Sequence, residues 1–221
     1  MLLSFRTLVT MSLSTLAGLG VLAVRAATTN QASAEQFRPI KEAEMPKGFP
    51  TYTPVGQIEI KKYPVYRKAS ASGPTEFWTL FRHIKQNNVT MTAPVEMDYG
   101  DPRAPNNKER SMSFLYERPD QGSAGRQGSV EVTDVPAMTV VSIGCRGART
   151  TAAIAEAREK LVAWIDQKKG EYVSAGPMRI MGYNSPFVPR DRNFFEVQIP
   201  VKAAKADRSK VEDGSRELES R

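Results

Sequence analysis

The sequence contains little of the chemistry that metal and redox sites most often use. Its 221 residues include one cysteine, Cys145, and one histidine, His83. A single cysteine cannot form an intramolecular disulfide, a cysteine-rich zinc site or a covalent C-x-x-C-H haem attachment. A single histidine excludes every site that needs two or three imidazoles from one chain. Any imidazole chemistry in this protein therefore belongs to His83.

The common catalytic motifs are also missing. The sequence has no G-x-S-x-G, no P-loop, no G-x-G-x-x-G and no paired-histidine metal motif. It shows no nucleophile paired with a base, and acyl or proton-transfer chemistry needs such partners within hydrogen-bond reach. We therefore expect a protein without enzyme activity. Cys145 ends the apolar run 140–145 and is expected to be a core residue, with a reactive or metal-binding thiol as the alternative.

The N-terminus is typical of an export signal and is only moderately apolar. Residues 8–24 carry no charge and follow Arg6, and residues 24–26 offer a cleavage site before Ala27. Serine, threonine and glycine make this run less apolar than the ~20 residues of a spanning helix. We expect residues 1–26 to be a cleaved export signal, which predicts a periplasmic or secreted protein without a stable membrane span. An uncleaved N-terminal anchor and a cytosolic protein are the alternatives.

The excess of positive charge is small once both ends are set aside. The net charge is +7, and removing residues 1–26 (+2) and 202–221 (+1) leaves +4 for residues 27–201. So small an excess, without a clustered basic patch, argues against nucleic acid as a partner. Residues 202–221 contain few large apolar side chains and are expected to be a disordered charged tail. Residues 27–48 are small and polar and predict a flexible linker, so the folded domain should span residues 49–201.

Within this domain the chain repeats itself. Residues 58–66 align with residues 130–138 at an offset of 72, with glutamate and proline at matching positions. Apolar and polar residues alternate at the start of each copy, which is the period of a half-buried strand. Pro64 and Pro136 cannot donate a hydrogen bond to a ladder, so each should lie at a strand edge, bulge or break.

A helix and two strands are predicted after each copy. Pro74 suits the start of a helix that ends at Asn87, and residues 150–151 can cap a second helix that ends at Gly170. The predicted strands that follow the helices are residues 89–97, 111–117, 178–183 and 193–201. Either half alone would bury little, so the two should share one sheet. We predict an α+β fold: a distorted, mainly antiparallel β-barrel with two flanking helices, in which the unit β-α-β-β occurs twice.

The first predicted helix combines an apolar face with cations. The apolar side chains recur at i, i+3, i+4 and i+7, and they are Phe77, Leu80, Phe81 and Ile84. Arg82 and Lys85 provide positive charge beside them. Such a surface suits a flat, apolar dianion such as haem, because apolar walls hold the macrocycle and cations pair with its propionates. An ordinary amphipathic helix has the same pattern, so the residues alone leave both interpretations open.

Two kinds of side chain in this sequence could ligate haem iron. His83 lies beside the apolar face of the first helix, where it is either a boundary residue or an axial ligand. Seven of the nine methionines follow residue 26, and a thioether can also ligate haem iron. Filling irregular gaps in the core is the commoner role of methionine.

Several segments resemble one protein family. Residues 89–95 read V-T-M-T-A-P-V, which resembles the M-T-A-P-V signature of the SOUL haem-binding protein family. The further matches follow in the order of the family. Residues 58–64 resemble its opening E-x-R-x-Y strand, and residues 112–115 resemble its S-F-L strand. Its closing G-Y-x-x-P…R-R-N-E-V stretch is matched by residues 182–187, 192–193 and 196–197. The family's Arg-Arg-Asn is replaced here by Asp191-Arg192-Asn193, so the charge around the ligand can differ.

The resemblance implies a distorted β-barrel with two helices and an internal pseudo-twofold. It also implies noncovalent binding of haem or another tetrapyrrole in a hydrophobic cleft beside the first helix, in a carrier or buffer role. Carried onto this chain, the cleft would be formed by Phe77, Leu80, Phe81, Arg82, His83, Ile84 and Lys85, with His83 as the candidate axial ligand. The alternatives are a module of the same fold that binds a non-haem small ligand or a protein, and an enzyme that acts on a porphyrin or ester.

Overall fold

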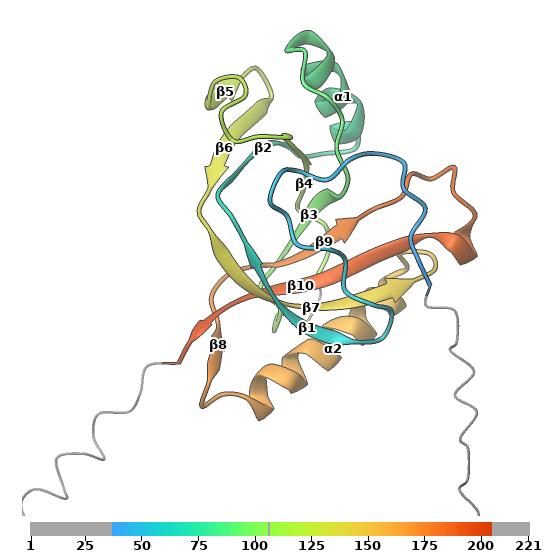
Figure 1. The fold of residues 1–221 in the computed structure, drawn as a ribbon, viewed down its shortest axis with the longest axis vertical. Helices are drawn as coiled ribbons and strands as arrows, with labels where there is room; N and C mark the ends of the chain where they lie inside the picture. Colours follow the sequence, from blue (N-terminus) through green and yellow to red (C-terminus); the bar gives the residue numbers. More distant parts are fainter. Residues whose placement is uncertain (1–36, 106, 205–221) are drawn as a thin grey trace, which may run out of the picture. The chain divides into compact units, whose positions relative to one another are not determined.

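The computed structural model describes residues 37–105 and 107–204 (Figure 1). Residues 1–36, which include the predicted export signal, and residues 205–221 of the predicted tail lie outside the described residues. The described part contains α1 (Glu76–Gln86), α2 (Thr151–Gln167) and the short 3-10 helix η1 (Arg190–Arg192). Its strands are β1 (Ile58–Tyr63), β2 (Tyr66–Ala71), β3 (Val95–Gly100), β4 (Ser111–Leu115), β5 (Gly125–Gln127), β6 (Val130–Val135), β7 (Met138–Arg146), β8 (Tyr172–Ser174), β9 (Met178–Gly182) and β10 (Phe194–Ala203).

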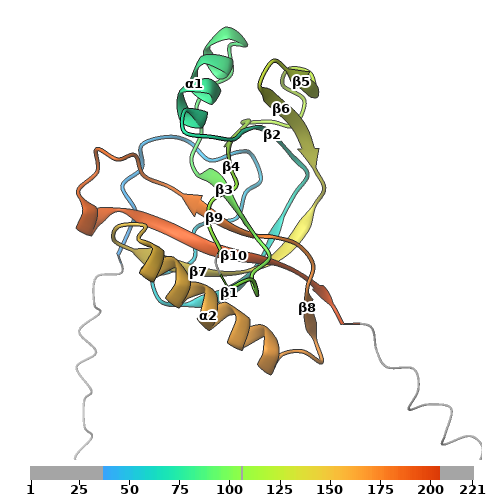
Figure 2. The ribbon, with the colours of Figure 1, turned by 180° about the vertical axis from the view of Figure 1, so that it is seen from behind.

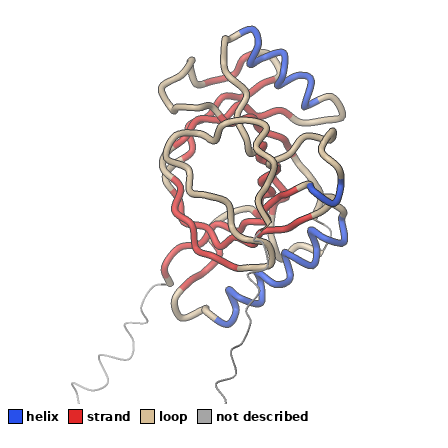
Figure 3. The backbone as a smooth tube through the Cα atoms, turned by 45° about the vertical axis from the view of Figure 1, so that its right-hand side comes forward, coloured by secondary structure: helices blue, strands red, loops and turns tan. Residues whose placement is uncertain are grey.

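The ten strands form one antiparallel sheet in the order β1-β7-β10-β9-β3-β4-β2-β6-β5, with β8 paired to β10. Figure 3 shows the strands curving round an interior face. Closure into a barrel requires hydrogen bonds between the two terminal strands, and within the described residues no ladder joins β1 to β5. The sheet is therefore open. The predicted α+β class, with antiparallel pairing and two helices, is confirmed, whereas the predicted closure into a barrel does not occur.

Pro64 and Pro136 each separate two strands, β1 from β2 and β6 from β7. Because proline has no amide hydrogen, the chain leaves one ladder there and joins another. β1 pairs with β7, whereas β2 pairs with β4 and β6. Two strands therefore precede each helix, where the predicted β-α-β-β unit has one. The pairing order is symmetric about the β3–β9 pair, since β3-β4-β2-β6 on one side corresponds to β9-β10-β7-β1 on the other.

The two helices pack on the outer face of the sheet and lie at opposite ends of it (Figures 1 and 2). α1 buries Leu80 and Ile84 in a core with side chains of β2, β4 and β6. α2 buries Leu161 in a second core with side chains of β7 and β10. The Thr150 side chain accepts a hydrogen bond of 3.1 Å from the Ala153 amide and caps α2, as predicted. In the part of the chain that the structure describes, neither helix has the length and apolar character to cross a membrane.

The interior face of the sheet holds buried charges. Glu96 of β3 and Glu196 of β10 both pair with Met181 of β9, so the two carboxylates lie in one row across the sheet. Arg179 donates to Glu96 over 3.0 Å, and Lys61 donates to Glu196 over 2.8 Å. Burial alone would raise the pKa of Glu96, but the nearby cations, Arg179 first, lower it below its usual value. An ion-pair network therefore occupies the interior.

Residues 37–48, part of the predicted flexible linker, pack against the folded domain. Phe37 and Met45 contact a third core cluster, which lies on the interior side of the sheet. The Lys47 amide donates to the Glu117 carbonyl over 2.9 Å. The linker prediction is therefore wrong for residues 37–48, because a few apolar anchors and backbone hydrogen bonds order a segment whose composition is mainly small and polar.

Removing one member of the ion-pair network should destabilise the fold strongly. We expect Glu96→Ala to lower the free energy of unfolding by about 3–5 kcal/mol, because Arg179 and Lys68 would then be charged and unpaired near the interior. The matched control is Glu131→Ala on β6, an exposed glutamate, with an expected change within about 0.5 kcal/mol. Urea unfolding of both variants measures the two values, and equal losses would show that the network does not stabilise the sheet.

Candidate functional site

A cavity of about 550 Å³ lies beside α1. Its walls come from α1, from the connection between α1 and β3, from the loop between β9 and β10, and from the N-terminal segment. Its lining includes five aromatic side chains, two methionines and one arginine: Phe77, Trp78, Phe81, Tyr183, Phe187, Met91, Met112 and Arg149. We call it the aromatic cavity and take it as the candidate site.

Phe77 joins the aromatic wall of the cavity to the core. Its ring centroid lies 5.4 Å from that of Phe114 in an edge-on contact, and 5.3 Å from that of Trp78 in a second one. Phe81 stacks on Phe77 at 6.3 Å. Edge-on and offset-stacked pairs are the preferred arrangements of aromatic rings. The wall is therefore a connected set of rings anchored on a buried phenylalanine.

The residues predicted for the cleft are divided between two faces of α1. Phe77 and Phe81 line the aromatic cavity. Leu80 and Ile84 are buried against the sheet and do not line it. The sequence pattern places these four residues on one face of the helix. In the structure, one edge of that face packs in the core and the other edge lines the cavity.

Arg82 and Lys85 are exposed and do not line the cavity itself. They follow Trp78 by four and seven residues, which places all three on one face of the helix. The Lys85 ammonium lies 5.5 Å from the centroid of the Phe81 ring. The two predicted cations therefore stand next to the cavity wall, on the side that faces solvent.

His83 lies away from the aromatic cavity. Its side chain is 5% exposed, and Nε2 forms a hydrogen bond of 2.8 Å with the Tyr116 hydroxyl. Nδ1 lies 3.3 Å from the Asn87 amide nitrogen. Burial lowers the pKa of His83 below its usual value, which favours the neutral ring. Both ring nitrogens thus have protein partners, and the structure does not bring His83 together with Phe77 and Phe81.

Arg149 is a cation at the cavity that sequence reasoning missed. It precedes α2 in the chain and lies across Gly182 at the end of β9. A Cβ atom at position 182 would come within 2.7 Å of the Arg149 Nη1 atom, so glycine leaves room for the guanidinium in this position. The same nitrogen lies 2.8 Å from the Met97 sulfur. No local pattern marks Arg149, because only the pairing of β9 with β3 and β10 brings it to α1.

Glu42 ties the N-terminal segment to the loop between β9 and β10. Its carboxylate accepts hydrogen bonds of 2.7 Å from both the amide and the hydroxyl of Ser185. Partial burial would raise the pKa of Glu42, but these bonds and one from Asn184 lower it below its usual value. The segment predicted to be a linker is therefore part of the cavity wall, since Glu42 and Ala43 line it.

The other missed wall residues come from segments that carry the family resemblance. Met91 lies in residues 89–95, and Tyr183 and Phe187 lie in residues 182–187. The sequence thus contained a signal for them. It did not show that both segments fold back against α1.

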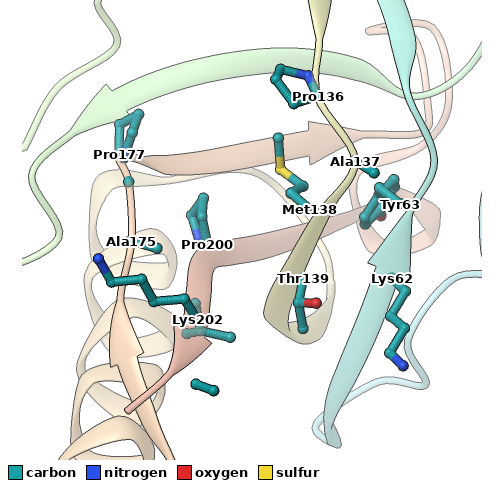
Figure 4. A pocket seen from close by; sticks show the side chains of 13 residues that line it. Lys62, Tyr63, Pro136, Ala137, Met138, Thr139, Ala175, Pro177, Pro200 and Lys202 are labelled. Carbon is teal, nitrogen blue, oxygen red and sulfur yellow. The ribbon is translucent and has the colours of Figure 1, made fainter. Parts of the chain in front are cut away.

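A second hollow of about 700 Å³ lies at the end of the sheet away from α1 (Figure 4). Pro136, Pro177 and Pro200 line it, and Tyr63 is its one aromatic side chain. Lys62 and Lys202 are its cations. Its lining has little flat apolar surface compared with the aromatic cavity, so it is the weaker candidate for a planar ligand.

The described residues contain no group of three or more histidine, cysteine, aspartate or glutamate side chains that could hold a metal ion. Cys145 is half-buried, and burial raises the pKa of its thiol to about 12. A thiol with so high a pKa is a poor nucleophile at neutral pH. This agrees with the structural role expected for Cys145.

Sequence comparison identifies the family of the chain. The family model described as SOUL heme-binding protein matches residues 49–200. The chain belongs to this family. The match covers both helices, strands β1 to β9 and residues 194–200 of β10, and it includes residues 89–95 and 182–187. No curated protein sequence matches this SOUL-family chain.

The fold of this SOUL-family protein is also found in other solved structures. The crystal structure of the EcmrR C-terminal domain has a TM-score of 0.50 and 19% identity, and the match covers 66% of this chain and 97% of that one. EcmrR in its complex with DNA and RPo has a TM-score of 0.51 and 17% identity, with 66% of this chain and 57% of that one covered. At these identities the likeness concerns the fold alone.

We predict that His83 contributes to stability and to its pH dependence. His83→Ala leaves the buried Tyr116 hydroxyl without its partner and should lower the free energy of unfolding by about 1–3 kcal/mol. Because the folded pKa of His83 is lowered, the unfolded chain binds the proton more readily, and stability is lost as pH falls below about 6.5. Urea unfolding at pH 7.5 and 5.5 measures how much the free energy of unfolding falls between the two pH values. This fall should be smaller for His83→Gln than for the wild type. Identical losses would contradict this assignment.

Proposed function

We propose that this SOUL-family protein binds haem or another tetrapyrrole noncovalently in the aromatic cavity. The observation that carries the proposal is a cavity of about 550 Å³ whose lining includes five aromatic side chains. That volume lies within the ~300–1,000 Å³ typical of small-molecule sites. Aromatic rings can stack on a flat macrocycle, and Arg149, Arg82 and Lys85 are cations in or beside the cavity that could pair with propionates.

The side chains present also suit a site that does not depend on an imidazole. Haem, when bound, supplies an iron centre with axial coordination positions. Met91 and Met112 line the cavity and carry thioethers, which ligate haem iron in some proteins. We propose that the apolar walls provide most of the affinity, and that the iron is held by a thioether or by no protein side chain. His83 has no part in this form of the proposal.

We further propose an exported carrier or buffer without catalysis. The uncharged N-terminal run supports export, and the lack of a nucleophile paired with a base supports a binding role. Nucleic acid is not a proposed partner, because the net charge of residues 27–201 is only +4.

A second candidate function is the binding of a non-haem apolar molecule or a protein segment in the same cavity. The absence of a histidine among the lining residues favours this alternative. Mass spectrometry of ligands that copurify with the protein separates the two candidates.

A haemin titration tests the proposed function. We expect a saturable shift of the Soret band with a Kd below about 10 μM, because weaker binding corresponds to only about 7 kcal/mol and haemin adheres to many proteins. Trp78→Ala should weaken binding about tenfold, since it removes an aromatic contact of about 0.5–1.5 kcal/mol and its buried area. His83→Gln should leave the spectrum and the Kd unchanged.

The matched control is Trp164→Ala, which alters the only other tryptophan and lies on α2. It should not change the haemin affinity. A titration without saturation would contradict tetrapyrrole binding, and an equal effect of both tryptophan variants would contradict the aromatic cavity as its place.

A further inference from the structure

Large aromatic side chains are exposed at the mouth of the aromatic cavity. Phe187 is 95% exposed and Trp78 is 65% exposed, and both line the cavity. They belong to different elements, the loop between β9 and β10 and helix α1. A single exposed aromatic residue needs no explanation, but a group of them at one opening marks an interaction surface.

The loop that carries Phe187 holds it outward on fixed supports. Val188 is buried, and its carbonyl accepts a hydrogen bond of 2.7 Å from the Asn193 side chain. On the other side, Ser185 is held by Glu42. The backbone is thus anchored two residues before and one residue after Phe187. Its exposure is a feature of an ordered loop.

Cations without an ion-pair partner lie near these aromatic side chains in the chain. Arg190 and Arg192 follow Phe187 in the chain, and Arg82 and Lys85 share the exposed helix face of Trp78. None of the four forms an ion pair within the described ranges 37–105 and 107–204. The exposed carboxylates beside them are Asp191 and Glu42, two against the four cations, and the Glu42 carboxylate is engaged by Ser185. The surface therefore has an excess of positive charge around an apolar centre.

Aromatic side chains and cations together are the features that bind a protein to an anionic bilayer. Tryptophan and phenylalanine insert at the depth of the headgroups, and arginine and lysine remain at the phosphates. Each cation near such a surface strengthens binding by about fivefold. We propose that this face, formed by Trp78, Phe187, Arg82, Lys85, Arg190 and Arg192, docks on a membrane surface that contains anionic phospholipid.

Docking in this orientation turns the opening of the aromatic cavity toward the lipid. An apolar molecule could then pass between the bilayer and the cavity without crossing water. The docking proposal does not rest on tetrapyrrole binding, because the exposed aromatic residues and the cations are present whatever the ligand is.

The experiment uses the full chain without ligand and vesicles in which brominated lipid quenches nearby tryptophan. Since the chain has two tryptophans, Trp164→Phe leaves only Trp78 and Trp78→Phe leaves only Trp164. With vesicles of phosphatidylcholine and 30% phosphatidylglycerol, we expect strong quenching of Trp78 and little quenching of Trp164. With phosphatidylcholine alone, we expect little quenching of either.

Charge reversal identifies the face that docks. In the Trp164→Phe background, the double change Arg190→Glu and Arg192→Glu should raise the concentration of anionic lipid that gives half-maximal quenching by about 30-fold or more. Phe187→Ser should raise it as well. The matched control reverses Lys168 and Lys169 at the end of α2 with the same change in net charge, and should have less than a twofold effect. Residues 1–26 are identical in all variants, so they do not contribute to the differences.

Three results would overturn the proposal. They are equal quenching of the two tryptophans, equal quenching by neutral and anionic vesicles, and equal effects of the two charge reversals. All the altered side chains are exposed or half-buried, and an unchanged thermal midpoint confirms that each variant is folded. A failed haemin titration would leave these results unaffected, so the two proposals are tested separately.

Discussion

The ion pairs inside the curved sheet determine where the other parts of this protein lie. Glu96 and Glu196 are buried, and a buried carboxylate without a partner costs several kcal/mol. Arg179 and Lys61 neutralise them across strands that are far apart in sequence. The interior face holds these ion pairs together with one apolar cluster, and the apolar clusters under the two helices form on the outer face of the sheet. The aromatic cavity accordingly lies at α1, on the outer side of the sheet.

The position of α1 fixes the shape of the aromatic cavity. Leu80 and Ile84 lock one side of the helix into the core, and His83 is bonded to Tyr116 on another. The helix cannot rotate without breaking these contacts, so Trp78 and Phe81 must face the cavity. A wall that is ordered before binding lowers the entropy lost on binding. The packing of Leu80 and Ile84 thus sets the position of the aromatic rings that line the cavity.

The sequence was sufficient for features that depend on local patterns. The alternation in residues 58–66, the cap at Thr150 and the aromatic spacing from Phe77 to Phe81 indicated strands, helix start and cavity wall. Features that depend on distant pairing were not predictable in this way. Arg149 lies against Gly182 at the end of β9, a contact between distant parts of the chain. Residues 37–48 are held by partners outside the segment, such as Glu117. Pro64 was recognised as a break, but its consequence, a change of partner strand, required the topology.

The single histidine has a different meaning once the structure is known. In the sequence, His83 was the obvious candidate for an iron ligand because it was the only imidazole beside an aromatic helix face. In the structure, the bond to Tyr116 turns that imidazole toward the sheet, and the cavity is left with aromatic rings, thioethers and cations. Such a lining suits a ligand that is flat and apolar and carries negative charge at its edge, whatever metal it contains.

The free protein leaves Trp78 and Phe187 in water, which is unfavourable by about 25 cal/mol for each Å² of apolar surface. Whatever covers these two side chains recovers that free energy, so the opening of the cavity is where both a ligand and a lipid surface gain most from contact.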